Sequence, residues 1–291
     1  MPAPFTKDLC GYRAHGKPNT SDSTSKQSVD LGIALFDALG VSRDAKGEDE
    51  TGLPLAKRVL GDLNARLHTA GSSRLVGEDR APAEFEQYHH VGAFDQLSIE
   101  PSREYIKAWA QLTRGVRRQM PPSAIDGFNS LAESVECAVA DEVAARRSVL
   151  NGVAQESLLH LDVTVSNNLV PGYPELDIGL SLKWSLRTDR AQDCRTQGAK
   201  LAALRRGRMP HFAAVTIEPR PYMLNLLCGG SGDIDCVYHL HLQALNQAID
   251  LVLRPKTDRK SRRTVDTFDR LIDQRRLRDY DELVTYALTL T

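Results

Sequence analysis

The ten residues Ser181-Leu182-Lys183-Trp184-Ser185-Leu186-Arg187-Thr188-Asp189-Arg190 mark the junction between two patterns of secondary structure. Residues 177–183, which lead into them, place apolar side chains at even positions and small or polar ones at odd positions, as in a half-buried strand. Side chains of a strand repeat their direction every two residues, so we expect Ser181 and Lys183 on one face. Residues 190–206 then repeat apolar side chains at spacings of three and four, which predicts a helix.

Further strands and helices are predicted on both sides of this junction. Residues 159–166 alternate apolar and polar side chains, and residues 212–217 and 235–240 form two more strand-like runs. Helical periodicity is found in residues 28–40, after Pro54, in residues 103–119 and 124–150, and in most of the last 50 residues. Residues 1–27 are predicted to form an irregular arm. The order strand, turn, strand, helix, strand predicts an α/β core wrapped by N- and C-terminal helices.

Composition and charge limit the class of protein. With 41% hydrophobic and 26% charged residues the chain is ordinary and globular, and its net charge of −1 does not by itself indicate nucleic-acid binding. No apolar run approaches the about 20 residues of a membrane span, and the N-terminus lacks a signal-peptide core, so we expect a cytoplasmic protein without a membrane partner. The five scattered cysteines favour reduced thiols. Cys236, His239 and His241 leave a zinc site open, beside the plainer interpretation of side chains alternating along a strand or helix end.

Asp162 is the first candidate for catalysis, because it lies on the polar face of its predicted strand. If this strand pairs with residues 177–183, Asp162 can face Ser181 and Lys183. Phosphodiester hydrolysis needs a metal ion, Mg²⁺ prefers carboxylate and water oxygens, and a nearby lysine can orient the nucleophile. An aspartate and a lysine on neighbouring strands are also common without such a role.

Arg187, Asp189 and Arg190 supply a second, independent signal. Arginine can donate two hydrogen bonds to guanine, and aspartate can accept one from cytosine. Three such groups within four residues could reach the major groove together, although a surface salt-bridge cluster is the plainer alternative. Two basic runs, residues 205–208 and 254–263, could neutralise phosphates or could simply be solvated surface.

The block SLKWSLRTDRAQ, residues 181–192, resembles the signature of the NgoMIV family of type II restriction endonucleases. Similar stretches follow in the same order at residues 206–211 (RGRMPH), 215–219 (VTIEP) and 232–239 (GDIDCVYH). The resemblance implies a restriction-endonuclease-like fold of the PD-(D/E)xK superfamily, which is a central mixed β-sheet flanked by helices. It also implies Mg²⁺-dependent cleavage of double-stranded DNA at a palindromic site with a CCGG core.

No repeat or linker divides the chain, so we predict one restriction-endonuclease-like domain over residues 1–291. Within it, the N-terminal arm and helices take up about residues 1–150. The catalytic and base-reading core follows over about residues 151–250, and C-terminal helices over about residues 251–291.

The resemblance assigns roles to the site residue by residue. Lys183 matches the catalytic lysine, and Ser181 supports the site where many nucleases of this fold keep an acid. Asp162 matches the metal-binding aspartate, and the backbone carbonyl of Leu182 is expected to join it on Mg²⁺. Gln197 occupies the position of a glutamate that completes the metal site in the family, so the position is kept but the charge is missing.

A second family glutamate aligns with Ala56, which leaves the set of carboxylates incomplete. Nearby acids that could substitute for it are Glu48, Asp49, Glu50 and Asp62. Glu175 and Asp177 are further carboxylates. However, six residues of extended strand separate Asp177 from Lys183 by about 20 Å, too far to share a metal.

For the bases themselves, the resemblance implies that Arg187, Asp189 and Arg190 read the CCGG core. Asp22 falls near a family position that reads the flanking base pair, and the partner arginine of the family would fall at Met223, three residues after Arg220. The resemblance therefore leaves the identity of the flanking base pair undetermined, and GCCGGC is one candidate for the whole recognition sequence.

A homodimer would present this set of residues to both half-sites of a palindrome, and a tetramer is the alternative assembly. Two other functions stay open. One is a catalytically weak, sequence-specific DNA-binding protein on a nuclease fold, and the other is a repair nuclease without sequence preference.

Overall fold

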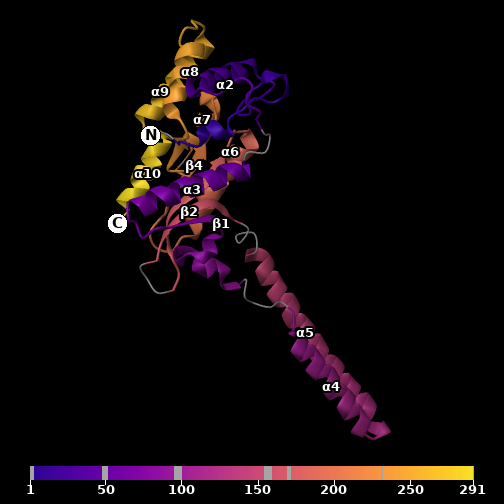
Figure 1. Cartoon of the computed structure of the whole chain (residues 1–291). Helices are drawn as coiled ribbons and strands as arrows, with labels where there is room; N and C mark the ends of the chain where they lie inside the picture. Colours follow the sequence, from indigo (N-terminus) through magenta and orange to yellow (C-terminus); the bar gives the residue numbers. More distant parts are fainter. Residues whose placement is uncertain are drawn as a thin grey trace. The chain divides into compact units, whose positions relative to one another are not determined.

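The computed structural model describes residues 3–47, 52–94, 100–153, 159–168, 172–230 and 232–290. The chain forms two compact units, one made of Met1–Tyr88 and Leu159–Thr291 and the other of His89–Leu158 (Figure 1). One domain over residues 1–291 stays a prediction.

A mixed sheet of six strands lies at the centre of the larger unit, within the described residues, in the spatial order β1 to β6. The strands are β1 (Leu75–Arg80), β2 (Leu161–Asn167), β3 (Glu175–Lys183), β4 (His211–Thr216), β5 (Cys236–His239) and β6 (Leu277–Asp279). β1, β2 and β3 pair antiparallel, and β3 to β6 pair parallel. The four predicted strands are confirmed as β2 to β5, and so is the predicted α/β fold with a mixed sheet. β1 and β6 were not predicted.

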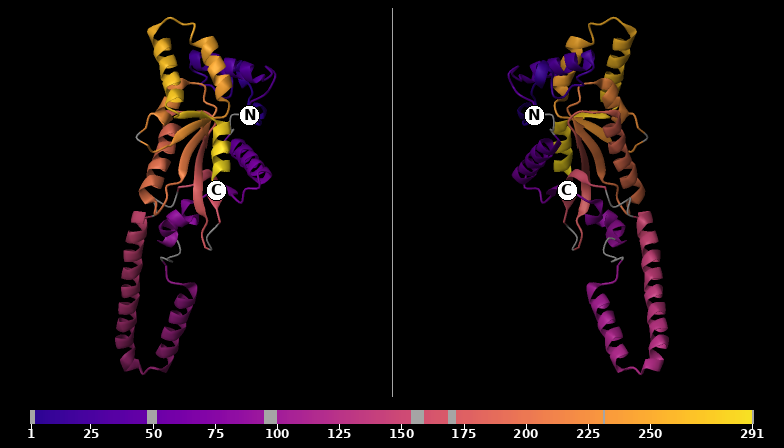
Figure 2. Two further views of the ribbon diagram at one scale, coloured as in Figure 1. Left: turned by 90° about the vertical axis from the view of Figure 1, so that its left-hand side faces the viewer. Right: turned by 90° about the vertical axis from the view of Figure 1, so that its right-hand side faces the viewer.

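Helices cover both faces of this sheet. α3 (Gly52–Thr69) and α10 (Tyr280–Thr289) lie on one face, and α6 (Thr188–Leu204) and α7 (Pro221–Cys228) lie on the other (Figure 2). The unit also contains α1 (Thr6–Leu9), η1 (Ala14–Gly16), α2 (Lys26–Leu39), η2 (Pro82–Glu84), α8 (Leu242–Val252) and α9 (Arg259–Asp273). Because both faces are covered, almost every side chain of β2 and β3 is buried, and Asp162 and Lys183 are among the few that are partly exposed.

α6 packs tightly against its neighbours at Gly198. A Cβ atom at this position would lie 1.8 Å from the carbonyl oxygen of Asp233 and 2.9 Å from the ring of Phe212. The close packing therefore requires glycine here. It also fixes the height of α6 above the sheet, and with it the start of the helix, where Arg187 is the N-cap residue.

The N-terminal segment is irregular, as predicted, but it is packed and not a free arm. Asn19, Thr20 and Ser21 are buried, although all three side chains are polar. Arg13 supports their backbone by donating hydrogen bonds to the carbonyls of Asn19 and Ser21, at 2.8 and 3.2 Å. The segment continues into α2, which packs against α8.

The smaller unit is a helical hairpin. Its elements are α4 (Arg103–Gln119), η4 (Pro122–Ala124) and α5 (Ile125–Val153), and η3 (Glu86–Phe94) begins just before the unit does. Figure 1 shows α4 and α5 side by side, and Trp109 Nε1 of α4 donates to Glu136 Oε1 of α5 at 3.0 Å. Both helices were predicted. The predicted apolar stripe of α5 is buried only in part, because Ala132 is 5% exposed but Val135 is 41% exposed.

The cysteines are free thiols, as predicted, and all but Cys137 are buried. His239, on β5 beside Cys236, is fully buried, and burial lowers its pKa to about 3, so its ring is neutral. Its Nδ1 atom accepts a hydrogen bond from the amide of His241 at 3.1 Å, which gives it a structural role. Among the described residues, no helix is long and apolar enough to cross a membrane.

Candidate active site

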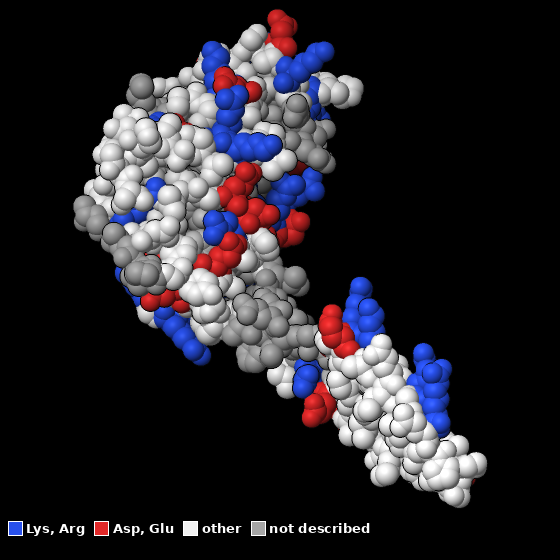
Figure 3. Space-filling model, turned by 60° about the horizontal axis from the view of Figure 1, so that its bottom comes forward, with Lys and Arg blue, Asp and Glu red and all other residues white. Residues whose placement is uncertain are grey.

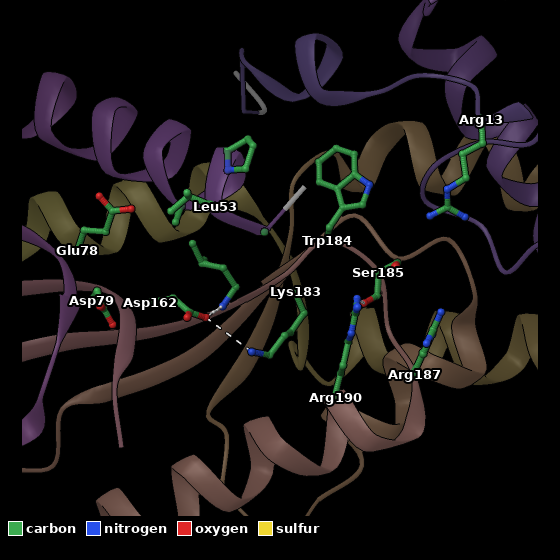
Figure 4. A pocket seen from close by; sticks show the side chains of 14 residues that line it. Arg13, Leu53, Glu78, Asp79, Asp162, Lys183, Trp184, Ser185, Arg187 and Arg190 are labelled. Atoms are coloured by element: carbon green, nitrogen blue, oxygen red, sulfur yellow. Dashed lines mark hydrogen bonds and ion pairs between the residues drawn. The ribbon is translucent and has the colours of Figure 1, made fainter. Parts of the chain in front are cut away.

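A cavity of about 880 Å³ opens beside the ends of β2 and β3 (Figure 4). Its walls come from the start of α3, from β1, β2 and β3, and from the loop that leads into α6. The polar or charged residues that line it are Arg13, Glu78, Asp79, Asp162, Lys183, Ser185, Arg187 and Arg190. Segments far apart in the sequence thus bring acids and bases into one cavity.

Asp162 and Lys183 face each other in this cavity, as the strand pattern predicted. Val163 pairs with Leu180 in the antiparallel register, so one further step along the strands places Asp162 opposite Ser181. Lys183 Nζ lies 3.8 Å from Asp162 Oδ2, and the amide of Leu182 donates to the same oxygen at 2.5 Å. Burial raises the pKa of the Asp162 carboxyl above its ordinary value, while Lys183 and the Leu182 amide oppose this shift.

Asp193 is a third member of this cluster that the sequence did not single out. Its Oδ2 atom lies 3.6 Å from Lys183 Nζ, so the ammonium group interacts with two carboxylates. Asp193 lies one turn before Gln197 on α6, and residues four apart share a helix face. This spacing was the available signal for Asp193. Glu78 and Asp79 also line the cavity, but they lie on β1, which was not predicted.

Four of the predicted positions differ in how they meet the cavity. Leu182 lines the cavity. Ser181 is only 1% exposed and contacts the thiol of Cys194. Burial raises the pKa of this thiol, and Ser181 opposes the rise. Gln197 is half-buried, and its Oε1 atom is buried without a hydrogen-bond partner among the described residues. Ala56 lines the cavity, as its alignment with a family glutamate requires, but it brings no charge.

The other carboxylates considered as substitutes are engaged elsewhere. Asp62 pairs with Arg66 at 3.1 Å. Asp177, at the far end of β3, pairs with Arg74 at 2.7 Å and also contacts Arg208, so its exclusion from the site on grounds of distance is supported. Glu175 likewise pairs with Arg208, at 3.0 Å. Glu48, Asp49 and Glu50 lie outside the described residues.

A divalent cation would find oxygen donors near Lys183. Among the residues that the structure describes, no group of three or more His, Cys, Asp or Glu side chains could hold a metal ion. The carboxylates of Asp162 and Asp193 are the donors that lie within 4 Å of Lys183 Nζ among the described residues, and Gln197, one turn after Asp193 on α6, adds a buried amide oxygen without a hydrogen-bond partner there. An all-oxygen set with few protein ligands fits Mg²⁺, which keeps several waters in its coordination shell.

Arg187, Asp189 and Arg190 are exposed at the start of α6. Arg187 and Arg190 line the cavity, and Figure 4 shows both side chains extending from the segment around the helix start. Within the described part of the chain, Asp189 forms no ion pair with either arginine, so the salt-bridge interpretation is not supported. Arg190 Nη1 donates to the carbonyl of Ser185 at 3.4 Å, which leaves its other donors available to a partner.

Asp22 and Arg220, which are far apart in the sequence, meet beside this segment. Arg220 Nη1 donates to Asp22 Oδ2 at 3.2 Å, and Thr24 holds the pKa of Asp22 below its ordinary value by donating two hydrogen bonds. The charges of Arg220 and Arg187 lower the pKa of Asp22 further.

Arg220 itself is 3% exposed and is enclosed by partners. Its guanidinium donates to Glu218 at 2.6 and 3.0 Å and to the carbonyl of Leu186 at 2.6 Å. Glu218, also fully buried, accepts from the amide of Leu186 at 2.7 Å. The pair thus holds the backbone directly before Arg187 in place, a role that the sequence did not reveal.

Comparison with known proteins agrees with this arrangement. The sequence model of the NgoMIV restriction enzyme family matches residues 16–288. The chain belongs to this family. The type II restriction enzyme NgoMIV of Neisseria gonorrhoeae is 36% identical to it over 279 residues, an alignment that covers 89% of this chain and 93% of that enzyme.

Membership of the NgoMIV restriction enzyme family confirms the predicted resemblance and identifies the chain as a site-specific restriction endonuclease. Its substrate class is DNA, and enzymes of this kind generally use a divalent metal ion. The family match includes the start of α6, the segment around Glu218 and all the residues that line the cavity except Arg13.

Proposed function

We propose that the chain is a Mg²⁺-dependent type II restriction endonuclease that cuts duplex DNA at a palindromic site with a CCGG core. The observation that carries this proposal is the position of Lys183, whose ammonium lies between two carboxylates in a cavity that Arg187 and Arg190 also line. Phosphodiester chemistry and base recognition would then take place a few residues apart.

Asp162 would hold the metal ion, together with the backbone carbonyl of Leu182. Asp193 and Gln197 would complete the site, directly or through water, because Asp193 lies 3.6 Å from Lys183 and Gln197 follows it one turn later on α6. A bound Mg²⁺ supplies neutralisation of phosphate charge and lowers the pKa of a water molecule. Lys183 would orient the attacking water and offset the negative charge that develops on the phosphate.

Ser181 would support the site from the interior, where its hydroxyl and the thiol of Cys194 pack behind Lys183 on β3 and α6. This position explains how a serine is tolerated where related nucleases keep an acid. A charged side chain at a position 1% exposed would need a partner of its own.

Base recognition would be divided between two groups of side chains. Arg187 and Arg190 would donate to guanines of the core, and Asp189 would accept from a cytosine. Asp22, with 37% of its side chain exposed, would read the outer base pair. Arg220 would act through Asp22 and Leu186, because its own donors are already occupied. GCCGGC is the candidate for the complete site.

A two-fold dimer would place one such cavity on each strand of the palindrome. Sedimentation of the enzyme bound to one cognate duplex tests this proposal, and a tetramer would appear as a complex with two duplexes.

The test of function uses four supercoiled plasmids, each with one CCGG-core palindrome flanked by a different base pair. In Mg²⁺, at least one plasmid should be cut at a defined position, which run-off sequencing locates. Lys183→Ala should abolish cutting and keep specific binding. Intact DNA in all four plasmids would refute the proposal, and cutting that survives Arg187→Ala and Asp189→Ala unchanged would indicate a nuclease without sequence preference.

One observation favours a second candidate, a sequence-specific binding protein with weak catalysis. Gln197 and Ala56 stand where the family keeps acids, so the enzyme has fewer metal-binding carboxylates. Tight Mg²⁺-independent binding without cleavage, together with activity gained by Gln197→Glu, would support this candidate.

A further inference from the structure

A basic groove of about 520 Å³ lies between α7 and α9, apart from the candidate active site. The residues that line it are Tyr222, Asn225, Arg259, Lys260, Arg263, Thr264 and Thr267. Three of them are cations, and each of the others carries a hydroxyl or an amide. The groove is thus built from hydrogen-bond donors and positive charge.

The cations of this groove form no ion pairs within the part of the chain that the structure describes. Within the described residues, no acidic side chain forms an ion pair with Arg259, Lys260 or Arg263, nor with Arg262 beside them. By contrast, Arg254, only five residues earlier, pairs with two aspartates at 2.5 and 2.8 Å. Figure 3 shows one face of the molecule, on which basic and acidic side chains are interspersed.

Their position on α9 is also unfavourable for the helix. All four lie in residues 259–263, at the positively polarised N-terminal end, where acidic side chains are favoured and the first turn contains none. Helix stability therefore does not explain four cations here. A bound anion would remove the repulsion, which indicates that the groove serves an anionic partner.

Tyr222 connects the groove with the proposed reader of the outer base pair. Its hydroxyl accepts a hydrogen bond from Arg220 Nη1 at 3.1 Å, and the guanidinium lies 5.5 Å from the centre of its ring. The same Nη1 atom donates to Asp22. A duplex whose outer base pair touches Asp22 would therefore continue toward Tyr222 and the cations behind it.

We propose that this groove binds backbone phosphates of the DNA immediately outside the recognition sequence. Lysine, arginine, tyrosine, threonine and asparagine side chains are the groups that usually contact phosphates, and such contacts position a protein without reading bases. The contact adds affinity that depends on duplex length and on salt but not on the flanking sequence. This inference rests on the proposed function, because it takes the duplex to lie against Asp22.

The test compares the wild type with the triple variant Arg259→Gln, Lys260→Gln, Arg263→Gln, whose substitutions are all on exposed side chains. Binding is measured by fluorescence anisotropy in Ca²⁺ over a series of salt concentrations, on two duplexes with the same cognate site. One duplex ends two base pairs beyond the site and the other continues for ten.

On the long duplex, the slope of log K against log salt concentration should become shallower by about 0.9 for each phosphate that the variant no longer neutralises, so by about 3 for the three side chains. On the short duplex the two proteins should have equal slopes. A charge-retaining variant, Arg259→Lys with Arg263→Lys, should behave as the wild type and controls for misfolding.

The matched control for net charge is Arg43→Gln, Arg146→Gln, Arg254→Gln, which removes three exposed arginines from ion pairs elsewhere. It should leave the slope on the long duplex unchanged. Equal slopes for the wild type and the groove variant on the long duplex would overturn the inference, as would an equal change on both duplexes. A wild type that binds neither duplex specifically would instead count against the proposed function.

Discussion

Replacement of Arg220 by methionine tests whether its buried pair with Glu218, which holds the backbone before Arg187, stabilises the fold. Arg220 and Glu218 are both buried, and Arg220 Nε lies 2.6 Å from Glu218 Oε1. Arg220→Met leaves the Glu218 carboxylate buried without its cation, a change that commonly costs about 3–5 kcal/mol. The loss of the donor to the Leu186 carbonyl adds about 1 kcal/mol. We expect the free energy of unfolding to fall by about 4–6 kcal/mol.

The loss should depend on pH in a defined direction. Burial raises the pKa of Glu218, and in the wild type Arg220 is the main opposing influence. Without Arg220 the pKa rises further, so the folded state binds the proton more tightly than the unfolded state does. The deficit of Arg220→Met is therefore smallest near the unfolded pKa and grows as the pH rises through the raised folded value.

Urea denaturation at pH 5.5 and pH 8, followed by circular dichroism, measures both effects. The matched control is Glu218→Gln combined with Arg220→Met, which keeps an acceptor for the Leu186 amide and removes the charge. It should recover about 2 kcal/mol relative to the single variant at pH 8. A loss below about 1 kcal/mol for Arg220→Met, or the same loss at both pH values, would refute the reasoning, because it would mean that water reaches Glu218 in the variant.

Three further predictions concern the packing and charge of the site. Gly198→Ala should lower the free energy of unfolding in urea by about 2–3 kcal/mol, because the new Cβ atom would overlap the backbone of Asp233. Gly61→Ala on α3, whose Cβ atom meets open space, should raise the free energy of unfolding by about 0.5–1 kcal/mol. Equal effects of the two substitutions would show that α6 can shift freely. Burial raises the pKa of Asp162, so its charged form destabilises the metal-free fold at high pH. The Asp162→Asn variant should therefore have a higher melting temperature than the wild type at pH 8, and the difference should shrink toward pH 4. Coincident melting curves at pH 8 would contradict this prediction. Gln197→Glu should lower the Mg²⁺ concentration needed for half-maximal cleavage about tenfold, and an unchanged Mg²⁺ titration would place Gln197 outside the metal site.

The strand pattern alone placed Asp162 against Lys183. Period-two alternation fixes which face a side chain occupies, and only the pairing of β2 with β3 had to be assumed. Gln197 was likewise placed on the side of α6 that faces inward, where its Oε1 atom is buried. Local periodicity therefore recovered the elements and faces of the site.

Features that depend on distant partners were not recoverable in this way. β1 has the sequence LVGEDR, which contains too few apolar residues to indicate a strand, and it forms because β2 offers an edge for pairing. Pro221 is typical of the end of a strand, but it occupies the first turn of α7, where proline is favoured. The spacing of Asp193 from Gln197 indicates only its helix face, and its distance of 3.6 Å from Lys183 arises only in the folded chain.

The distribution of the cysteines makes one thiol chemically distinct. Burial raises the pKa of Cys194 and of Cys236 to about 11 and that of Cys10 and Cys228 as well, so these thiols stay protonated near neutral pH and react slowly. Cys137, on α5, is exposed. A maleimide dye or a spin label should therefore attach to the helical hairpin at one native position, because the other four thiols are buried. No cysteine lines the candidate active site, so the label would not block it. The unaltered chain thus carries its own attachment point for following the hairpin spectroscopically while DNA binds.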